Sequence, residues 1–283
     1  MASIFVNEEG TVRNGWRVVA FLLLSVIVVA VLIAASRELP EHVAYWFPEV
    51  YLSALGVLGV TWLFMRLERR PLAQVGLEVS PRALRQFGIG MAYGAGLVLA
   101  TALLVVALGG LHFEMAPQVS VIDIVKTGLF MAGAVLFEET LFRGYAFQRT
   151  VGGMGRRWAL GLFAVVFLLA HPMEETMPPE LSTIASANLV LAALLLGQVM
   201  LRSGGLAMPI GLHLGWNWML QTLGFSISGK LAFDSIWHPV FDSEVQWLTG
   251  DAWGIEASVL SLVVLLAAVL WFSRGEPEDG APA

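Results

Sequence analysis

The chain has 283 residues, of which 57% are hydrophobic and 13% are charged, and its formal net charge is −6. A soluble domain of this size needs more polar side chains to cover its surface, so the composition indicates a membrane protein. Cysteine is absent, which excludes disulfides, a thiol nucleophile and cysteine-ligated zinc. No basic block suggests nucleic acid as a partner.

Eight segments are long and apolar enough to cross a bilayer as helices, so we predict an all-α fold, a polytopic bundle of about eight transmembrane helices. The predicted spans are roughly residues 16–36, 46–66, 86–109, 120–149, 156–171, 182–202, 205–222 and 256–273. Neither a repeat nor a soluble domain is evident, so residues 1–283 are predicted to form a single integral membrane domain. Gly90 and Gly94 form a small-xxx-small pair that is typical of close helix packing.

The basic residues predict the orientation of the spans, because lysine and arginine concentrate on the cytoplasmic side of a membrane. With the N-terminus inside, most arginines fall at inner ends or loops, and the outer side receives Arg37, Lys126 and Lys230. We therefore predict that both termini are cytoplasmic and that the lipid bilayer is a partner of the chain.

Two segments outside the spans have a distinctive composition. The outer loop from about 223 to 255 carries Trp237, Trp247 and Trp253, which favours anchoring at the lipid–water boundary over a role as a substrate lid. The tail from about 275 to 283 is composed mainly of glycine, proline, alanine and acidic residues, and it is predicted to be disordered.

Three formal charges interrupt the fourth predicted span, at Glu138, Glu139 and Arg143. A charged side chain near the bilayer centre costs roughly 2.5–3.5 kcal/mol, so a cluster of charges in a spanning helix indicates a function. Glu139 and Arg143 are four residues apart with the acid first, and they are predicted to form an ion pair. Glu138 lies about 100° around the helix, has no local partner and is free to face a cavity.

Polar residues in two other spans fall at the depth of Glu138. Counting from the arginines at the inner boundary places Glu138, His171, His213 and Asn217 roughly 16–23 Å from it, near the middle of the hydrocarbon core. Simpler interpretations exist, since His213 and Asn217 can hold helices together and His171 can end a span. The shared depth nevertheless favours a common site. The remaining histidines fall in predicted outer loops and are interpreted as surface residues: His42, His112 and His238.

Such a layer has the outline of a peptide hydrolase with a glutamate base. A carboxylate and an imidazole that share one water can take its proton as it attacks a carbonyl carbon, and a second imidazole and an amide can stabilise the oxyanion. The motifs of serine, aspartate and H-E-x-x-H zinc proteases are absent from the chain. Zinc on His171, His213 and Glu138 stays chemically possible, because two histidines and one glutamate form a catalytic ligand set.

These residues resemble the CPBP family of intramembrane glutamate proteases, which includes the CAAX prenyl endopeptidases and bacteriocin-processing relatives. The resemblance lies within residues 136–217, where three motifs occur in the family's order. The first is E-E-x-x-x-R at Glu138, Glu139 and Arg143, and it includes F-R-G at Phe142, Arg143 and Gly144. The second is F-x-x-x-H at Phe167 and His171, and the third is H-x-x-x-N at His213 and Asn217. It implies that Glu138 and His171 activate the water, that His213 and Asn217 form the oxyanion hole, and that Glu139 and Arg143 support them without a metal or other cofactor.

We therefore expect a multi-pass intramembrane endopeptidase of a prokaryotic cell membrane, acting on a peptide or prenylated (CAAX-type) protein substrate that is membrane-associated. A zinc-dependent version of the same protease is one alternative. A non-enzymatic membrane factor, such as a bacteriocin-immunity or scaffold protein, is another, and an ion or proton carrier using Glu138 and the histidines is a third. The first three spans and the last carry none of the motifs, so the resemblance to the family does not predict the substrate specificity of this chain.

Overall fold

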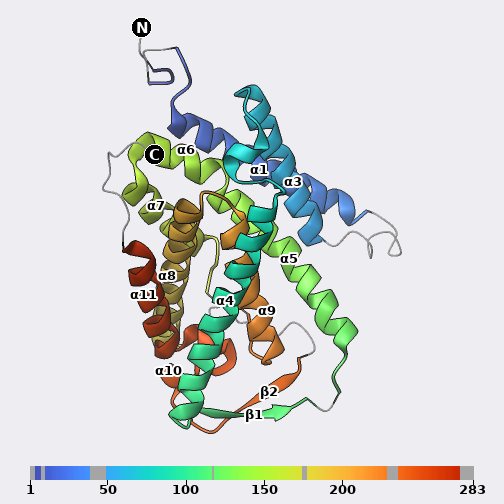
Figure 1. The fold of residues 1–283 in the computed structure, drawn as a ribbon, viewed down its shortest axis with the longest axis vertical. Helices are drawn as coiled ribbons and strands as arrows, with labels where there is room; N and C mark the ends of the chain where they lie inside the picture. The colour runs from blue at the N-terminus through green and yellow to red at the C-terminus, as the bar shows by residue number, and fades with distance from the viewer. Residues whose placement is uncertain are drawn as a thin grey trace.

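The computed structural model describes residues 4–7, 10–38, 49–116, 118–173, 177–227 and 235–274. The predicted disordered tail and His42 lie outside these ranges. The longer helices are α1 (Asn14–Ser36), α3 (Glu49–Leu67), α4 (Pro81–Ala107), α5 (Val121–Arg143), α6 (Tyr145–Met154), α7 (Arg156–Leu169), α8 (Pro179–Ser203), α9 (Ala207–Thr222) and α11 (Val259–Ser273) (Figure 1). The shorter elements are η1 (Leu72–Val75), β1 (Leu111–Met115), β2 (Trp237–Phe241), α10 (Gln246–Thr249), η2 (Asp251–Trp253) and η3 (Ile255–Ala257).

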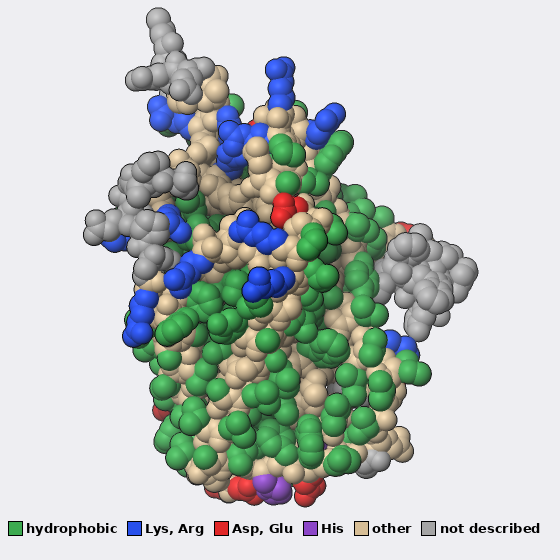
Figure 2. Space-filling view, viewed as in Figure 1, with side chains coloured by type: hydrophobic (Ala, Val, Ile, Leu, Met, Phe, Trp, Pro, Cys, Tyr) green, Lys and Arg blue, Asp and Glu red, His purple; other side chains and the backbone are tan. Residues whose placement is uncertain are grey.

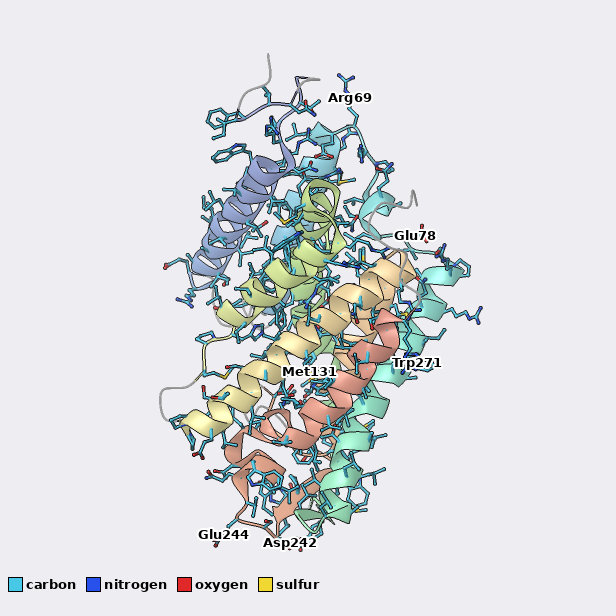
Figure 3. All side chains as sticks on the ribbon, turned by 90° about the vertical axis from the view of Figure 1, so that its left-hand side faces the viewer. Arg69, Glu78, Met131, Asp242, Glu244 and Trp271 are labelled. Atoms are coloured by element: carbon cyan, nitrogen blue, oxygen red, sulfur yellow. The ribbon has the colours of Figure 1, made fainter. Side chains whose placement is uncertain are left out.

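The predicted fold class, an all-α membrane bundle, is confirmed, and the chain is an integral membrane protein. Among the described helices, α1, α3, α4 and α8 are each long and apolar enough to cross a membrane, and α11 is a shorter apolar helix. The face drawn in Figure 2 has a broad hydrophobic band, with arginine and lysine gathered towards one end and acidic and histidine side chains at the other. Figure 3 places Arg69 at the first end and Asp242 and Glu244 at the second. The total of eight spans and the cytoplasmic termini stay predictions.

The fourth predicted span, residues 120–149, is wrong as a single helix, because the chain divides at Gly144 into α5 and α6. Gly144 has a ψ of −129°, and a Cβ at this position would overlap with the carbonyl oxygen of Thr140. The turn therefore requires glycine. Helix α6 then turns away from α5 and packs against α1 (Figure 1). The division leaves Glu138, Glu139 and Arg143 in the last turns of α5.

Helices α4 and α9 touch through their backbones. A Cβ on Gly94 of α4, or on Gly215 of α9, would overlap with a carbonyl oxygen of the facing helix. The close packing predicted from Gly90 and Gly94 is thereby confirmed, although the sequence analysis did not identify the glycines of α9 as its other half. Because α9 also carries His213 and Asn217, this contact helps to fix where these two side chains lie.

Gly94→Ala is expected to destabilise the bundle by about 1–3 kcal/mol, because the added methyl group overpacks the contact with the carbonyl oxygen of Leu212. Gly96→Ala in the same helix is the matched control, since nothing lies within 4 Å of a Cβ there. Alanine is favoured over glycine in a helix by up to about 1 kcal/mol, so the control should be neutral or slightly stabilised. Thermal unfolding in detergent, followed by circular dichroism, measures both. Equal melting temperatures would contradict the proposed contact.

The acidic end of the molecule contains a two-stranded antiparallel sheet that the sequence analysis did not predict. Leu111 of β1 lies opposite Phe241 of β2, and Met115 lies opposite Trp237. His112 is exposed, as predicted, and its Nδ1 lies 2.8 Å from a carboxylate oxygen of Asp242. This hydrogen bond raises the pKa of the imidazole, so the ion pair between β1 and the residue after β2 forms below the raised pKa, while Asp242 is ionised, and is lost as the pH rises through it.

The predicted outer loop, about residues 223–255, contains β2 and several short helical turns that reach the interior. The side-chain amide of Asn188 on α8 donates hydrogen bonds to the carbonyl oxygens of Glu256 and Ser258, at 2.7 and 3.1 Å. These bonds attach η3 to the bundle. Trp253 lines an internal cavity, whereas Trp247 is exposed. Anchoring of the loop at the lipid boundary stays a prediction.

Candidate active site

A cavity of about 340 Å³ lies inside the bundle, with walls contributed mainly by α5, α8 and α9. Its lining is largely apolar, but it includes Glu138, His171, His213 and Asn217. Met131, another lining residue, lies between the basic and acidic ends of the molecule in Figure 3. The four residues that were predicted to share one depth therefore surround one cavity.

His171 stands just after the end of α7, and its proton position follows from its neighbours. Nδ1 lies 2.8 Å from the carbonyl oxygen of Phe167, which can only accept a hydrogen bond, so Nδ1–H is the donor. A neutral ring then presents an unprotonated Nε2, which lies 3.8 Å from Oε2 of Glu138. The aromatic ring of Phe167 packs on the imidazole with 4.3 Å between the ring centroids. His171 is thus held with a proton acceptor facing Glu138.

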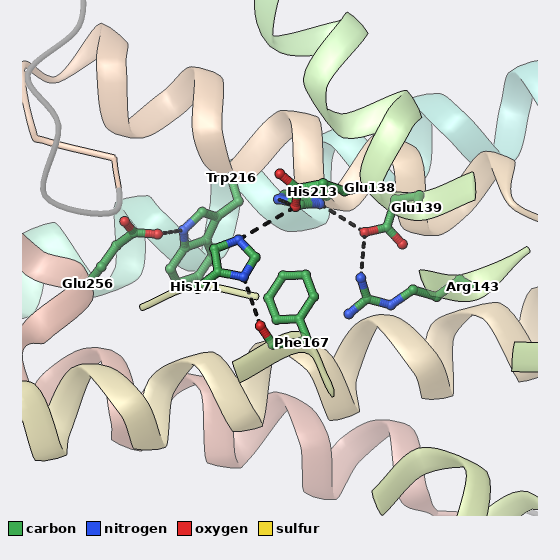
Figure 4. Close-up of polar contacts among 8 residues, drawn as sticks. All are labelled: Glu138, Glu139, Arg143, Phe167, His171, His213, Trp216 and Glu256. Atoms are coloured by element: carbon green, nitrogen blue, oxygen red, sulfur yellow. Dashed lines mark hydrogen bonds and ion pairs between the residues drawn. The ribbon is translucent and has the colours of Figure 1, made fainter. Parts of the chain in front are cut away.

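His213 is held by the second glutamate of the pair (Figure 4). Its Nδ1 lies 2.9 Å from Oε1 of Glu139, and its Nε2 lies 3.9 Å from Oε2 of Glu138. Because an ionised carboxylate can only accept, Nδ1–H donates to Glu139. Nε2 then carries a proton only when the ring is an imidazolium, so His213 can donate to a second group only in its charged form.

The carboxylate of Glu138 faces both histidines without a direct hydrogen bond to either. In the described part of the chain, Oε2 of Glu138 is a buried acceptor without a hydrogen-bond partner. Its distances of 3.8 and 3.9 Å to the two imidazole nitrogens exceed a direct hydrogen bond. One water lying in the cavity beside these atoms can bridge polar groups at such separations. A carboxylate and two imidazoles therefore converge on one point in the cavity.

Glu139 and Arg143 form the predicted ion pair, with 3.0 Å between Oε1 and Nη1, and both side chains are buried. The same oxygen of Glu139 accepts from His213, which the sequence analysis did not predict. The guanidinium carbon of Arg143 lies 4.5 Å from the ring centroid of Phe167. The pair thus supports both histidines, His213 through Glu139 and His171 through Phe167.

The sequence did not predict one charged residue of the cavity. Glu256 in η3 lines the cavity, and its Oε1 accepts a hydrogen bond from Nε1 of Trp216 at 2.8 Å (Figure 4). An acidic residue at the start of the last predicted span was the available signal. Trp216 precedes Asn217 on α9, so this contact joins η3 to the helix that carries two of the predicted site residues.

Within the described ranges, no group of three or more His, Asp or Glu side chains is arranged to hold a metal ion. His171, His213 and Glu138 stay the candidate ligands of the zinc-dependent alternative, which calls for a direct chemical test.

Residues 120–219 match the family model described as "Type II CAAX prenyl endopeptidase Rce1-like". The match runs from α5 to α9 and includes all three motifs. A sequence search of curated proteins gave no match. The family match supports a membrane protease in general. Residues 120–219 of the chain therefore carry an Rce1-like type II CAAX prenyl endopeptidase domain, which confirms the family that the three motifs predicted.

Proposed function

We propose that the protein is an intramembrane endopeptidase in which Glu138 activates a water molecule for hydrolysis of a peptide bond. The observation that carries the proposal is the convergence on Oε2 of Glu138, within 3.8 and 3.9 Å, of Nε2 of His171 and of His213. Asn217 lines the same cavity. A buried acceptor facing two imidazoles suits a general base better than it suits helix packing, where its hydrogen bonds would be satisfied.

The proposed reaction uses the proton positions described above. A water between Glu138 and His171 gives one hydrogen bond to the carboxylate and one to the unprotonated Nε2. As its oxygen attacks the carbonyl carbon of the substrate, Glu138 takes a proton from it. When the C–N bond breaks, that proton passes to the amine nitrogen that leaves. His171 orients the water, because its Nε2 accepts a hydrogen bond from the second hydrogen of that water during the attack.

His213 and Asn217 are proposed to stabilise the oxyanion. An imidazolium at position 213 donates Nδ1–H to Glu139, and it can donate Nε2–H to the developing negative charge. The side-chain amide of Asn217, one helical turn further along α9, supplies the second donor. Glu139 and Arg143 are proposed to hold His213 in this orientation.

The apolar lining of the cavity suits a substrate that enters from the membrane. We propose a membrane-associated peptide or a prenylated, CAAX-type protein as the substrate, which agrees with the name of the matching family. The chain would act as one domain in a prokaryotic cell membrane with both termini in the cytoplasm, as the arginine distribution predicts.

The experiment that tests this proposal is cleavage of a fluorogenic peptide panel, with and without prenyl groups, by the purified protein in the presence and absence of a strong chelator. We expect hydrolysis that survives chelation. Loss of activity on chelation and its recovery with zinc would instead make Glu138, His171 and His213 metal ligands. If no peptide is cleaved and sealed vesicles show proton flux that depends on Glu138, the carrier alternative replaces the protease.

A further inference from the structure

Three arginine side chains from separate parts of the chain converge on one carboxylate. Nη1 of Arg17, in the first turn of α1, lies 2.9 Å from Oε1 of Glu68, and Nη2 of Arg149 on α6 lies 2.6 Å from Oε2. Nε of Arg70 lies 4.0 Å from the same Oε2. The hydroxyl group of Tyr145 also donates to Oε1, at 2.6 Å. Three positive charges against one negative charge leave this arginine cluster with an excess of two positive charges.

The arginine cluster lies where two apolar helices end. Both α1 and α3 are long and apolar enough to cross a membrane, and Glu68 and Arg70 directly follow α3, just as Arg17 stands near the start of α1. Arg69, between them in the sequence, lies at the basic end of the molecule in Figure 3. The end of one span and the start of another at the same level mark a lipid–water boundary, where the phosphate groups of phospholipids lie.

An exposed tryptophan indicates the same boundary. The side chain of Trp62 on α3 is exposed, and the guanidinium carbon of Arg66, one helical turn further on, lies 5.9 Å from its ring centroid. Tryptophan is enriched at the level of the lipid headgroups, because its ring is apolar and its N–H is polar. Most residues of the neighbouring helix α1 are not buried by the rest of the chain. Lipid can therefore reach the arginine cluster along both helices.

The arginines are suited to hold a phosphate group. Each guanidinium offers five N–H donors in a planar fork, which matches the geometry of phosphate oxygens. Among the residues that the structure describes, Glu68 is the one carboxylate within 4.0 Å of the three guanidinium groups. The side chains of Arg17 and Arg149 are partly buried and that of Arg70 is exposed, so the cluster is set into the surface and stays accessible from it.

We propose that Arg17, Arg70 and Arg149 form a binding site for the phosphate group of an anionic phospholipid such as phosphatidylglycerol. The negative charge of this headgroup offsets the positive charge that Glu68 leaves unbalanced. A zwitterionic lipid brings a cation together with its phosphate group, so it binds more weakly. The bound headgroup would join α1, the segment after α3, and α6. The inference does not depend on the proposed peptidase function, because binding of lipid is measured without cleavage of a peptide.

The test is native mass spectrometry of the full-length protein in detergent, titrated with phosphatidylglycerol or with phosphatidylcholine of the same acyl chains. We expect the first phosphatidylglycerol to bind at least about 10-fold more tightly than phosphatidylcholine. Arg70→Gln should reduce this ratio about 5-fold, because it removes one of the two excess charges. Since Arg70 is exposed and lies farthest from Glu68 of the three, this variant should fold as the wild type does.

Arg37→Gln is the matched control. Arg37 follows the other end of α1, is exposed, and pairs with the single carboxylate of Glu49 at 3.5 Å, so it adds no excess charge there. The control should keep the wild-type ratio. Equal binding of the two lipids, an unchanged ratio in Arg70→Gln, or an equal change in Arg37→Gln overturns the inference.

A competition experiment separates a lipid headgroup from a soluble anion. Inorganic phosphate is added to the complex with phosphatidylglycerol, and sodium chloride of equal ionic strength serves as the reference. We expect both salts to have the same effect on the bound lipid, because a headgroup at the membrane boundary is also held by its acyl chains. Displacement of the lipid by inorganic phosphate alone would show that the arginine cluster binds a soluble anion, and the lipid proposal would be wrong.

Discussion

Glu138→Gln is expected to lower kcat by about 10²–10⁴-fold while the bundle remains folded, because glutamine keeps the shape of the side chain but cannot take a proton from water. Glu138 Oε2 has no hydrogen-bond partner among the described residues, so the substitution removes no such contact of this oxygen. The melting temperature should therefore stay close to that of the wild type. Steady-state cleavage of the best peptide, with KM measured separately, shows whether the loss lies in the chemical step.

Two companion variants make this result specific to the reaction centre. Glu114→Gln removes an exposed carboxylate on β1 that is not one of the residues lining the cavity, and it should retain wild-type kinetics. Adding His171→Ala to Glu138→Gln should cost much less than His171→Ala does alone, because groups that act on one water are not additive. A Glu138→Gln protein with more than about one-tenth of the wild-type kcat would contradict a glutamate base.

The shared height of the four residues along their helices was the part of the arrangement that the sequence could predict, because they line one cavity. Each residue of a helix adds about 1.5 Å of rise, so counting from boundary arginines placed Glu138, His171 and His213 at similar depth. Lateral position is not contained in that count. It depends on contacts such as the one between Gly94 of α4 and the backbone of Leu212 on α9, and predicting such a contact requires knowing which helices are neighbours.

Partners distant in the sequence were the part that could not be predicted. The spacing rule for helices identified Arg143 as the partner of Glu139, four residues away. It could not show that Glu139 also accepts from His213, 74 residues further on, or that Glu256 accepts from a tryptophan 40 residues earlier. The division at Gly144 was missed because the apolar pattern continues past it, and glycine is tolerated within helices.

The pair of Glu139 and Arg143 carries the largest expected effect on stability. Their side chains are 0% and 2% exposed, and the pair is joined at 3.0 Å. Removing charges from water costs several kcal/mol per ion, and their mutual attraction offsets this only while both are present. A variant that keeps Glu139 without Arg143 leaves a buried carboxylate with His213 as its other partner on the same oxygen, and it also removes the cation that packs on Phe167.

Arg143→Met is therefore expected to destabilise the protein by about 3–5 kcal/mol, or to prevent its folding. Lys126→Met on the same helix is the matched control, because it breaks the pair with Asp123, whose side chains are 63% and 42% exposed, and exposed pairs contribute about 0–1 kcal/mol. Thermal unfolding in detergent compares the two.

If Arg143→Met does not fold, the double variant Glu139→Gln/Arg143→Met, which removes both charges, should recover part of the stability. Equal melting temperatures for Arg143→Met and Lys126→Met would show that burial of this pair contributes nothing, and the support of His213 by Glu139 would then need another explanation.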